Sequence, residues 1–201
     1  MRTAGPASTT ALPERLRHET AAEHRALEAR VDLDARLAST DTYASLLAAL
    51  HPFHRLLEDL QGGRRGWDLL DPPVDLVARR KTHLLAADLR ALGRRPAPGL
   101  PAAPSLRGFA GALGALYVTE GSTLGGAIVA RRVAAQLGLG RDDGTAFFTS
   151  YGAGRGERWL ALRRSLESFS AAASPTECDD VVHGARATFL ALDDWLERTL
   201  G

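Results

Sequence analysis

An apolar helix with three glycines near its middle constrains this chain more than any other feature. The stretch LGALYVTEGSTLGGAIVARRV, residues 113–133, reads as a helix that Gly121, Gly125 and Gly126 interrupt. Each glycine in a helix interior costs about 1 kcal/mol relative to alanine, so together they cost about 3 of the roughly 5–15 kcal/mol that stabilise a domain. Gly121 and Gly125 are four residues apart and share one face, which Gly126 widens. This pattern predicts that something flat or bulky lies against bare backbone here.

Close packing of two helices is the alternative explanation for the glycines. Small residues are used wherever two helix backbones approach each other. Taken alone, the glycine pattern does not choose between a neighbouring helix and a bound ligand.

Composition is that of a single soluble globular domain. The chain has 201 residues, 45% of them apolar, and a formal net charge of +1, which gives no strong field for nucleic acid or an anionic membrane. Its beginning lacks an apolar signal core, and no run approaches eighteen apolar residues, so we expect a cytoplasmic protein. The single cysteine, Cys178, excludes an intrachain disulfide and a cysteine-based zinc cluster.

Helical periodicity covers most of the chain, and no alternating strand pattern is convincing. The sequence therefore predicts an all-α fold of seven to eight helices, with residues 1–9 as a tail and 10–201 as one domain. The proline-rich segment 93–104 is expected to be a connection. The first four expected helices cover about residues 10–30, 42–60, 74–92 and 105–138. The second is capped by Ser39-Thr40-Asp41 and kinked or broken at Pro52, and the fourth is interrupted by glycine. A short helix at 145–152, one that carries Trp159, Leu162, Leu166 and Phe169, and one that begins at Pro175 and is capped by Ser174 and Glu177 complete the set.

His24 is the candidate metal ligand on the first expected helix. It lies with Arg17 at the edge of an apolar stripe, whereas His18 points away. Such a histidine is commonly a core or boundary residue. The functional interpretation is an axial ligand to haem iron, with Arg17 near a propionate carboxylate. A histidine on one helix and bare backbone on another would allow a planar macrocycle to be clamped between them.

Three segments together resemble the haem oxygenase (heme oxygenase) family. They are LRHETAAEHRALE (16–28), ALYVTEGSTLGGAIVARRV (115–133), and FFTSYG followed by Arg158-Trp159 (147–159). The resemblance spans nearly the whole chain. It is nearest to the bacterial biliverdin-producing branch that is often encoded beside bacteriophytochromes.

The resemblance implies haem held between a proximal and a distal helix, with site residues at matching positions. It implies His24 as the iron ligand and Gly121, Gly125 and Gly126 on the distal side. Arg17 falls where the family often has a basic residue near the propionates. Tyr151 and Arg155 or Arg158 are further candidates for propionate contacts, and Phe147 and Phe148 for the pocket wall.

The implied activity is cleavage of haem to biliverdin, ferrous iron and carbon monoxide. Haem is then both substrate and cofactor, and O2 is the co-substrate. No glycine-rich turn follows a strand, so no flavin or nicotinamide site is expected, and electrons would come from a ferredoxin or a reductase. A bacteriophytochrome is a candidate recipient of the biliverdin. The alternatives are a non-catalytic haem carrier or sensor on this scaffold and a helical domain that binds no haem.

One residue departs from part of the family. Mammalian members place an aspartate after the first distal glycine, where this chain has Ser122, so the proton-delivery network cannot be transferred. The nearest carboxylate, Glu120, is expected to be a charge on the helix surface. His51 and His54 are three apart, but no partner pattern accompanies them, so they are not predicted to bind metal.

Overall fold

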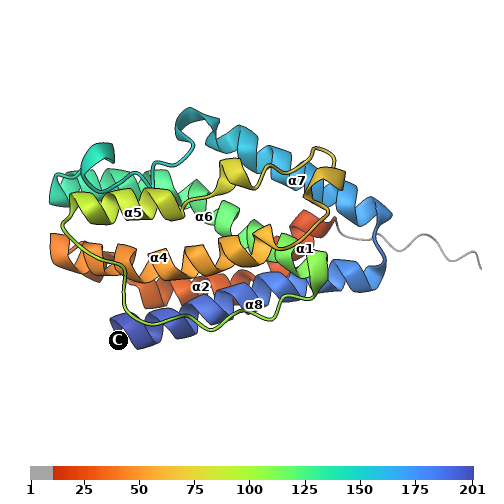
Figure 1. The fold of residues 1–201 in the computed structure, drawn as a ribbon, viewed down its shortest axis with the longest axis horizontal. Helices are drawn as coiled ribbons and strands as arrows, with labels where there is room; N and C mark the ends of the chain where they lie inside the picture. Colours follow the sequence, from red (N-terminus) through yellow and green to blue (C-terminus); the bar gives the residue numbers. More distant parts are fainter. Residues whose placement is uncertain (1–10) are drawn as a thin grey trace, which may run out of the picture.

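The computed structural model describes residues 11–201, and the expected tail at 1–9 lies outside them. The described residues contain eight α-helices, four short 3-10 helices and no strand, which confirms the all-α prediction (Figure 1). The α-helices are α1 (Leu12–Glu19), α2 (Ala21–Val31), α3 (Leu33–Arg36), α4 (Thr40–Gly62), α5 (Thr82–Ala91), α6 (Gly108–Leu137), α7 (Arg155–Ala172) and α8 (Pro175–Leu200); the 3-10 helices are η1 (Trp67–Leu69), η2 (Val77–Arg79), η3 (Arg141–Asp143) and η4 (Gly152–Gly154).

The expected first helix is in fact two helices that meet at Thr20. The Thr20 backbone has φ −108° and ψ 5°, and its hydroxyl donates to the Leu16 carbonyl at 2.7 Å. A threonine hydroxyl bonded back to its own helix offers the chain an alternative to the helical ladder. The break allows α2 to take its own direction along the molecule. Leu16 is buried in α1, whereas none of the α2 residues is buried.

Two further predictions about helix limits need correction. Pro52 neither breaks nor ends α4, which is assigned continuously from the capping box at Ser39. The expected helix at 74–92 begins only at Thr82, because the Glu58 carboxylate of α4 accepts hydrogen bonds from the backbone N–H groups of Lys81 at 2.6 Å and Thr82 at 2.9 Å. A carboxylate on the unpaired N–H groups of a first turn is a favourable cap.

Of two connecting segments, 93–104 has the predicted irregular structure, whereas 145–152 is not the predicted helix. Residues 93–104 form an irregular connection without a helix, and it runs along α4 and α8 in Figure 1. The short helix expected at 145–152 is a series of turns followed by η4. Asp88 on α5 organises this loop, because its buried carboxylate accepts from the N–H groups of Ala146 at 2.7 Å and Phe147 at 2.8 Å.

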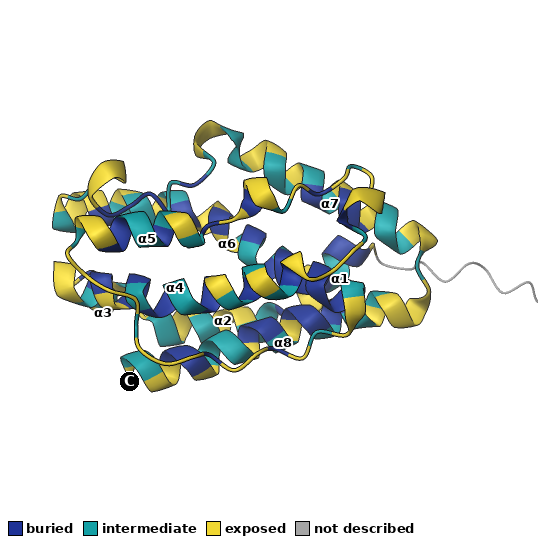
Figure 2. Ribbon diagram, in the orientation of Figure 1, coloured by how far each residue is buried: buried dark blue, intermediate teal, exposed yellow. Residues whose placement is uncertain are grey.

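The helix α6 passes through the middle of the fold and packs most extensively on α8. Glycines make this contact close: a Cβ on Gly114 would lie 2.0 Å from the Val181 carbonyl oxygen, and one on Gly184 would lie 2.2 Å from the Gly111 carbonyl oxygen. The glycines at 121–126 do not end the helix, which runs to a left-handed Gly138. Figure 2 shows buried residues concentrated in the first half of α6 and along α8.

None of the helices between residues 11 and 201 combines the length and the apolar character needed to cross a lipid bilayer.

Candidate functional site

A large cavity lies between α2 and the middle of α6. Its volume is about 910 Å³, toward the upper end of the roughly 300–1,000 Å³ of small-molecule sites. His24 borders it from α2, and Gly121, Ser122 and Gly125 border it from α6. The structure thus brings together the histidine and the two glycines that the sequence pairs. Its apolar walls come from the side chains of Leu27, Val31, Leu46, Leu50, Phe53, Phe147, Phe148, Phe189 and Leu192.

The cavity explains why α2 buries none of its side chains. Leu27 and Val31 are apolar, yet they remain partly exposed because they face the cavity. The His24 side chain is 53% exposed and meets the Phe189 ring edge-on at 5.7 Å between ring centroids. Its Nδ1 lies 3.4 Å from Oε2 of Glu28, one turn further along α2. A carboxylate beside one ring nitrogen orients an imidazole and favours ligation through the other nitrogen.

Gly125 and Gly121 leave bare backbone at two positions on the α6 side of the cavity. A Cβ on Gly125 would meet no atom within 4 Å, and one on Gly121 would make ordinary contact with the Trp159 ring at 3.6 Å. The Ser122 hydroxyl, which also borders the cavity, donates to the Thr119 carbonyl at 2.8 Å. Because its proton is used within the helix, Ser122 offers the cavity only oxygen lone pairs.

Three predicted site residues lie elsewhere and do not border the cavity. Gly126 packs against the loop, where a Cβ would lie 2.6 Å from the Phe148 carbonyl oxygen. Arg155 donates to the carbonyls of Phe148 at 3.3 Å and Ser150 at 3.5 Å. The Tyr151 hydroxyl donates to the Glu120 carboxylate at 2.8 Å. All three residues are therefore held by contacts within the protein, although the buried Nε of Arg155 has no hydrogen-bond partner in the described structure.

Arg158, the other arginine considered for the propionates, also lies outside the cavity wall. It donates to the Ala78 carbonyl at 3.4 Å, and its guanidinium lies 4.6 Å from the centroid of the Tyr151 ring. This stacking is a typical cation–π geometry.

A cationic edge of the cavity is formed by Arg17 and Arg163. Arg163 comes from α7, and the sequence pattern alone did not single it out. The carboxylate of Glu14 lies between them, 3.1 Å from Nη2 of Arg17 and 3.5 Å from Nη2 of Arg163. Tyr117 of α6 also borders the cavity. Burial raises the pKa of its hydroxyl; of the smaller electrostatic effects, Arg163 and Arg17 lower this pKa and Glu14 raises it.

Glu120 is buried beside this site, not on the helix surface as expected. Its side chain is 2% exposed, and its carboxylate accepts from Arg79, Lys81 and the Tyr151 hydroxyl. Because Arg80 is extended, with φ −62° and ψ 140°, the side chains on either side of it can point toward the same carboxylate. Burial lowers the pKa of Lys81 despite this partner. We call these four residues, Arg79, Lys81, Glu120 and Tyr151, the Glu120 cluster.

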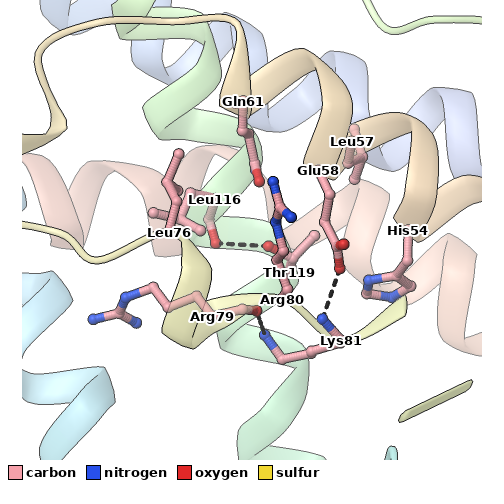
Figure 3. A pocket seen from close by; sticks show the side chains of 11 residues that line it. His54, Leu57, Glu58, Gln61, Leu76, Arg79, Arg80, Lys81, Leu116 and Thr119 are labelled. Atoms are coloured by element: carbon pink, nitrogen blue, oxygen red, sulfur yellow. Dashed lines mark hydrogen bonds between the residues drawn. The ribbon is translucent and has the colours of Figure 1, made fainter. Parts of the chain in front are cut away.

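A second, small cavity adjoins the Glu120 cluster (Figure 3). Its volume of about 20 Å³ is room for one water molecule. His54 and Thr119 border both cavities, and the buried Gln61 amide nitrogen has no hydrogen-bond partner in the described structure. Burial lowers the pKa of His54 to about 3, so its ring is neutral near pH 7. Within residues 11–201 no three His, Cys, Asp or Glu side chains are grouped to hold a metal ion.

Known proteins with similar folds include haem oxygenases. The structure of the NO- and CO-bound haem oxygenase from Neisseria meningitidis superposes with a TM-score of 0.82 at 24% identity, over 96% of this chain and 94% of that one. Haem oxygenase 2 from Chlamydomonas reinhardtii, solved without haem, superposes with a TM-score of 0.72 at 18% identity. The superposition covers 94% of this chain and 98% of that one. At these identities the likeness establishes the fold.

Sequence comparison establishes the relationship. The sequence model of the family "Heme oxygenase" matches residues 107–198. Haem oxygenase PigA from Pseudomonas aeruginosa is 32% identical over 190 residues, which cover 92% of this chain and 91% of PigA. A haem oxygenase from Xanthomonas campestris is 36% identical over 91 residues, covering 45% of this chain and 52% of that protein. The likeness to PigA spans both chains almost completely, and this chain belongs to the haem oxygenase family.

Proposed function

We propose that this protein is a haem oxygenase that holds haem in the cavity between α2 and α6. It cleaves haem to biliverdin, ferrous iron and carbon monoxide with O2 and externally supplied electrons. The observation that carries the proposal is the placement of His24 and of the bare backbone at Gly121 and Gly125 on the same cavity. Family membership by sequence supports the activity independently.

The residues around the cavity fit a flat, largely apolar, dianionic ligand. The open space above Gly125 leaves room for a ring against the helix backbone, and the walls are predominantly apolar. His24 is accessible and has a carboxylate near Nδ1. Arg17 and Arg163 lie at one edge, where guanidinium groups can pair with carboxylates. These features match the apolar ring, the iron and the propionates of haem.

Each site residue has a role that its surroundings support. His24 would ligate iron as a neutral imidazole through Nε2, and Glu28 would hold the orientation of that ring. Gly121 and Gly125 would let the distal backbone approach the ring closely, and Ser122 would accept a hydrogen bond from a water. When bound, haem supplies the iron that activates O2 and the ring that is oxidised.

Arg17, Arg163 and the Tyr117 hydroxyl are the propionate contacts that we infer for this chain. They replace Tyr151 and Arg155, because the Tyr151 hydroxyl and Nη2 of Arg155 bond within the protein and neither residue borders the cavity. The electron donor would be a separate ferredoxin or reductase. Delivery of biliverdin to a bacteriophytochrome is a prediction from the sequence motifs only.

Aerobic turnover followed by absorbance tests the function. Haem added to the protein should give a saturable Soret shift, and a reductant in air should convert that spectrum into the spectrum of biliverdin, with carbon monoxide released. His24→Ala should change the ligation spectrum and reduce turnover at least tenfold, because the iron loses its protein ligand. A saturable Soret shift with no verdohaem or biliverdin would instead indicate a carrier or sensor. The absence of any Soret shift would indicate a domain that binds no haem.

A further inference from the structure

Glu14 occupies the position between the two guanidinium groups that a carboxylate ligand would take. It lies in the first turn of α1, and one of its oxygens is 3.1 Å from Arg17 while the other is 3.5 Å from Arg163. All three side chains border the large cavity. The protein therefore supplies its own carboxylate to the cations at this edge.

The charges at this edge do not suit Glu14 and a dianionic ligand together. Two guanidinium groups and one carboxylate leave a single positive charge among these three residues. A ligand with two carboxylates brings two negative charges, which the arginines alone would neutralise. With Glu14 retained, one carboxylate is in excess, and like charges at close range repel.

We infer that Glu14 competes with the propionates for Arg17 and Arg163 and thereby sets how tightly substrate and product are held. This inference rests on the proposed haem-binding function. In the free protein Glu14 holds both arginines at the cavity edge. When the tetrapyrrole binds, its propionates displace the Glu14 carboxylate from the two arginines. When the product dissociates, Glu14 pairs with both arginines again. Glu14 thus weakens binding of both haem and biliverdin.

Glu14→Gln tests this competition in the absence of turnover. Exposed ion pairs such as these contribute about 0.2–1 kcal/mol each, so removing both competing pairs should tighten binding of ferric haem about two- to thirtyfold. The readout is the Soret titration of ferric haem without reductant. The dissociation rate of biliverdin, measured by stopped-flow absorbance, should fall by a similar factor.

Glu19→Gln is the matched control. Glu19 lies at the other end of α1 and also pairs with an arginine, Arg15, at 2.8 Å, but it does not border the cavity. It should leave haem affinity unchanged. With haem dimethyl ester, which lacks the free carboxylates, Glu14→Gln should give no gain over the wild type.

The possible outcomes separate this inference from the proposed function. If Glu14→Gln binds haem no more tightly than the wild type, or more weakly, Glu14 does not compete, although the haem site itself stands. An equal gain with the dimethyl ester would likewise overturn the inference. If the wild-type protein shows no saturable Soret shift, both the proposed function and the role of Glu14 fail.

Discussion

Replacing Gly125 with leucine should abolish haem binding and leave the protein folded. A Cβ at this position meets nothing within 4 Å, so a larger side chain can extend into the cavity without displacing the protein. Leucine is also a better helix former than glycine, by somewhat less than the roughly 0.8–1 kcal/mol that separates glycine from alanine, which favours an unchanged or raised melting temperature. The side chain would occupy the space proposed for the ring, so the Soret titration should lose its saturable phase.

The adjacent Gly126 provides the matched control. Its Cβ would lie 2.6 Å from the Phe148 carbonyl oxygen, a backbone atom that cannot move aside cheaply. Gly126→Ala should therefore lower stability, since overpacking costs about 1–3 kcal/mol. The two variants separate a ligand-facing glycine from a packing glycine. Normal haem binding by Gly125→Leu would show that this face of α6 does not meet the ligand.

Removing the Glu120 carboxylate should have the largest effect on stability. Glu120→Ala leaves Arg79 and Lys81, 7% and 2% exposed, without their anionic partner. Breaking a buried ion pair in this way costs about 3–5 kcal/mol, because an uncompensated charge remains buried. Urea unfolding followed by circular dichroism measures the loss. Glu167→Ala, at an exposed position within α7, should change the free energy of unfolding by less than about 0.5 kcal/mol.

A triple variant tests whether unpaired charge is the cause. Combining Glu120→Leu with Arg79→Met and Lys81→Met should recover most of the stability lost in Glu120→Ala, because apolar side chains of similar volume can replace a buried ion network. A loss of less than about 1 kcal/mol in Glu120→Ala would instead mean that water reaches the Glu120 cluster and solvates its cations.

Helix periodicity was sufficient to predict the fold class, because the long helices α4, α6 and α8 bury many apolar residues, although only three of the eight α-helices in residues 11–201 have a side-chain N-cap. The capping boxes at Ser39 and Ser174 occur where the sequence indicates them. The missed boundaries depend on contacts between distant segments. The start of α5 is set by Glu58 on another helix, more than twenty residues earlier in the chain. No sequence pattern within residues 74–92 indicates that Glu58 caps this helix.

The residues of the candidate site were predictable where the sequence pattern of a single helix indicates them. Residue type and spacing single out His24 on one helix and the glycines on another, the resemblance to haem oxygenases implies that they face one ligand, and the structure places His24, Gly121 and Gly125 on one cavity. Arg163, Tyr117 and Glu28 were not identified, because their roles appear only when α1, α2, α6 and α7 assemble. Glu120 was assigned to the surface because its cationic partners lie 39 and 41 residues away. One feature of the sequence could have drawn attention to the Glu120 cluster: Lys81 is the only lysine in the chain.

The glycine contacts between α6 and α8 have a consequence for reading relatives of this protein. Gly114 and Gly184 are required by the close contact between the α6 and α8 backbones, and Gly111 by the backbone of Leu106 just before α6, whereas Gly125 faces open space. Selection for folding should preserve the first three even in descendants that have lost haem chemistry. Only positions such as 125 would be released from selection when the ligand is lost. A homologue in which Gly125 is substituted, while Gly111, Gly114 and Gly184 are retained, would therefore be one that has the same fold and no longer carries out the reaction.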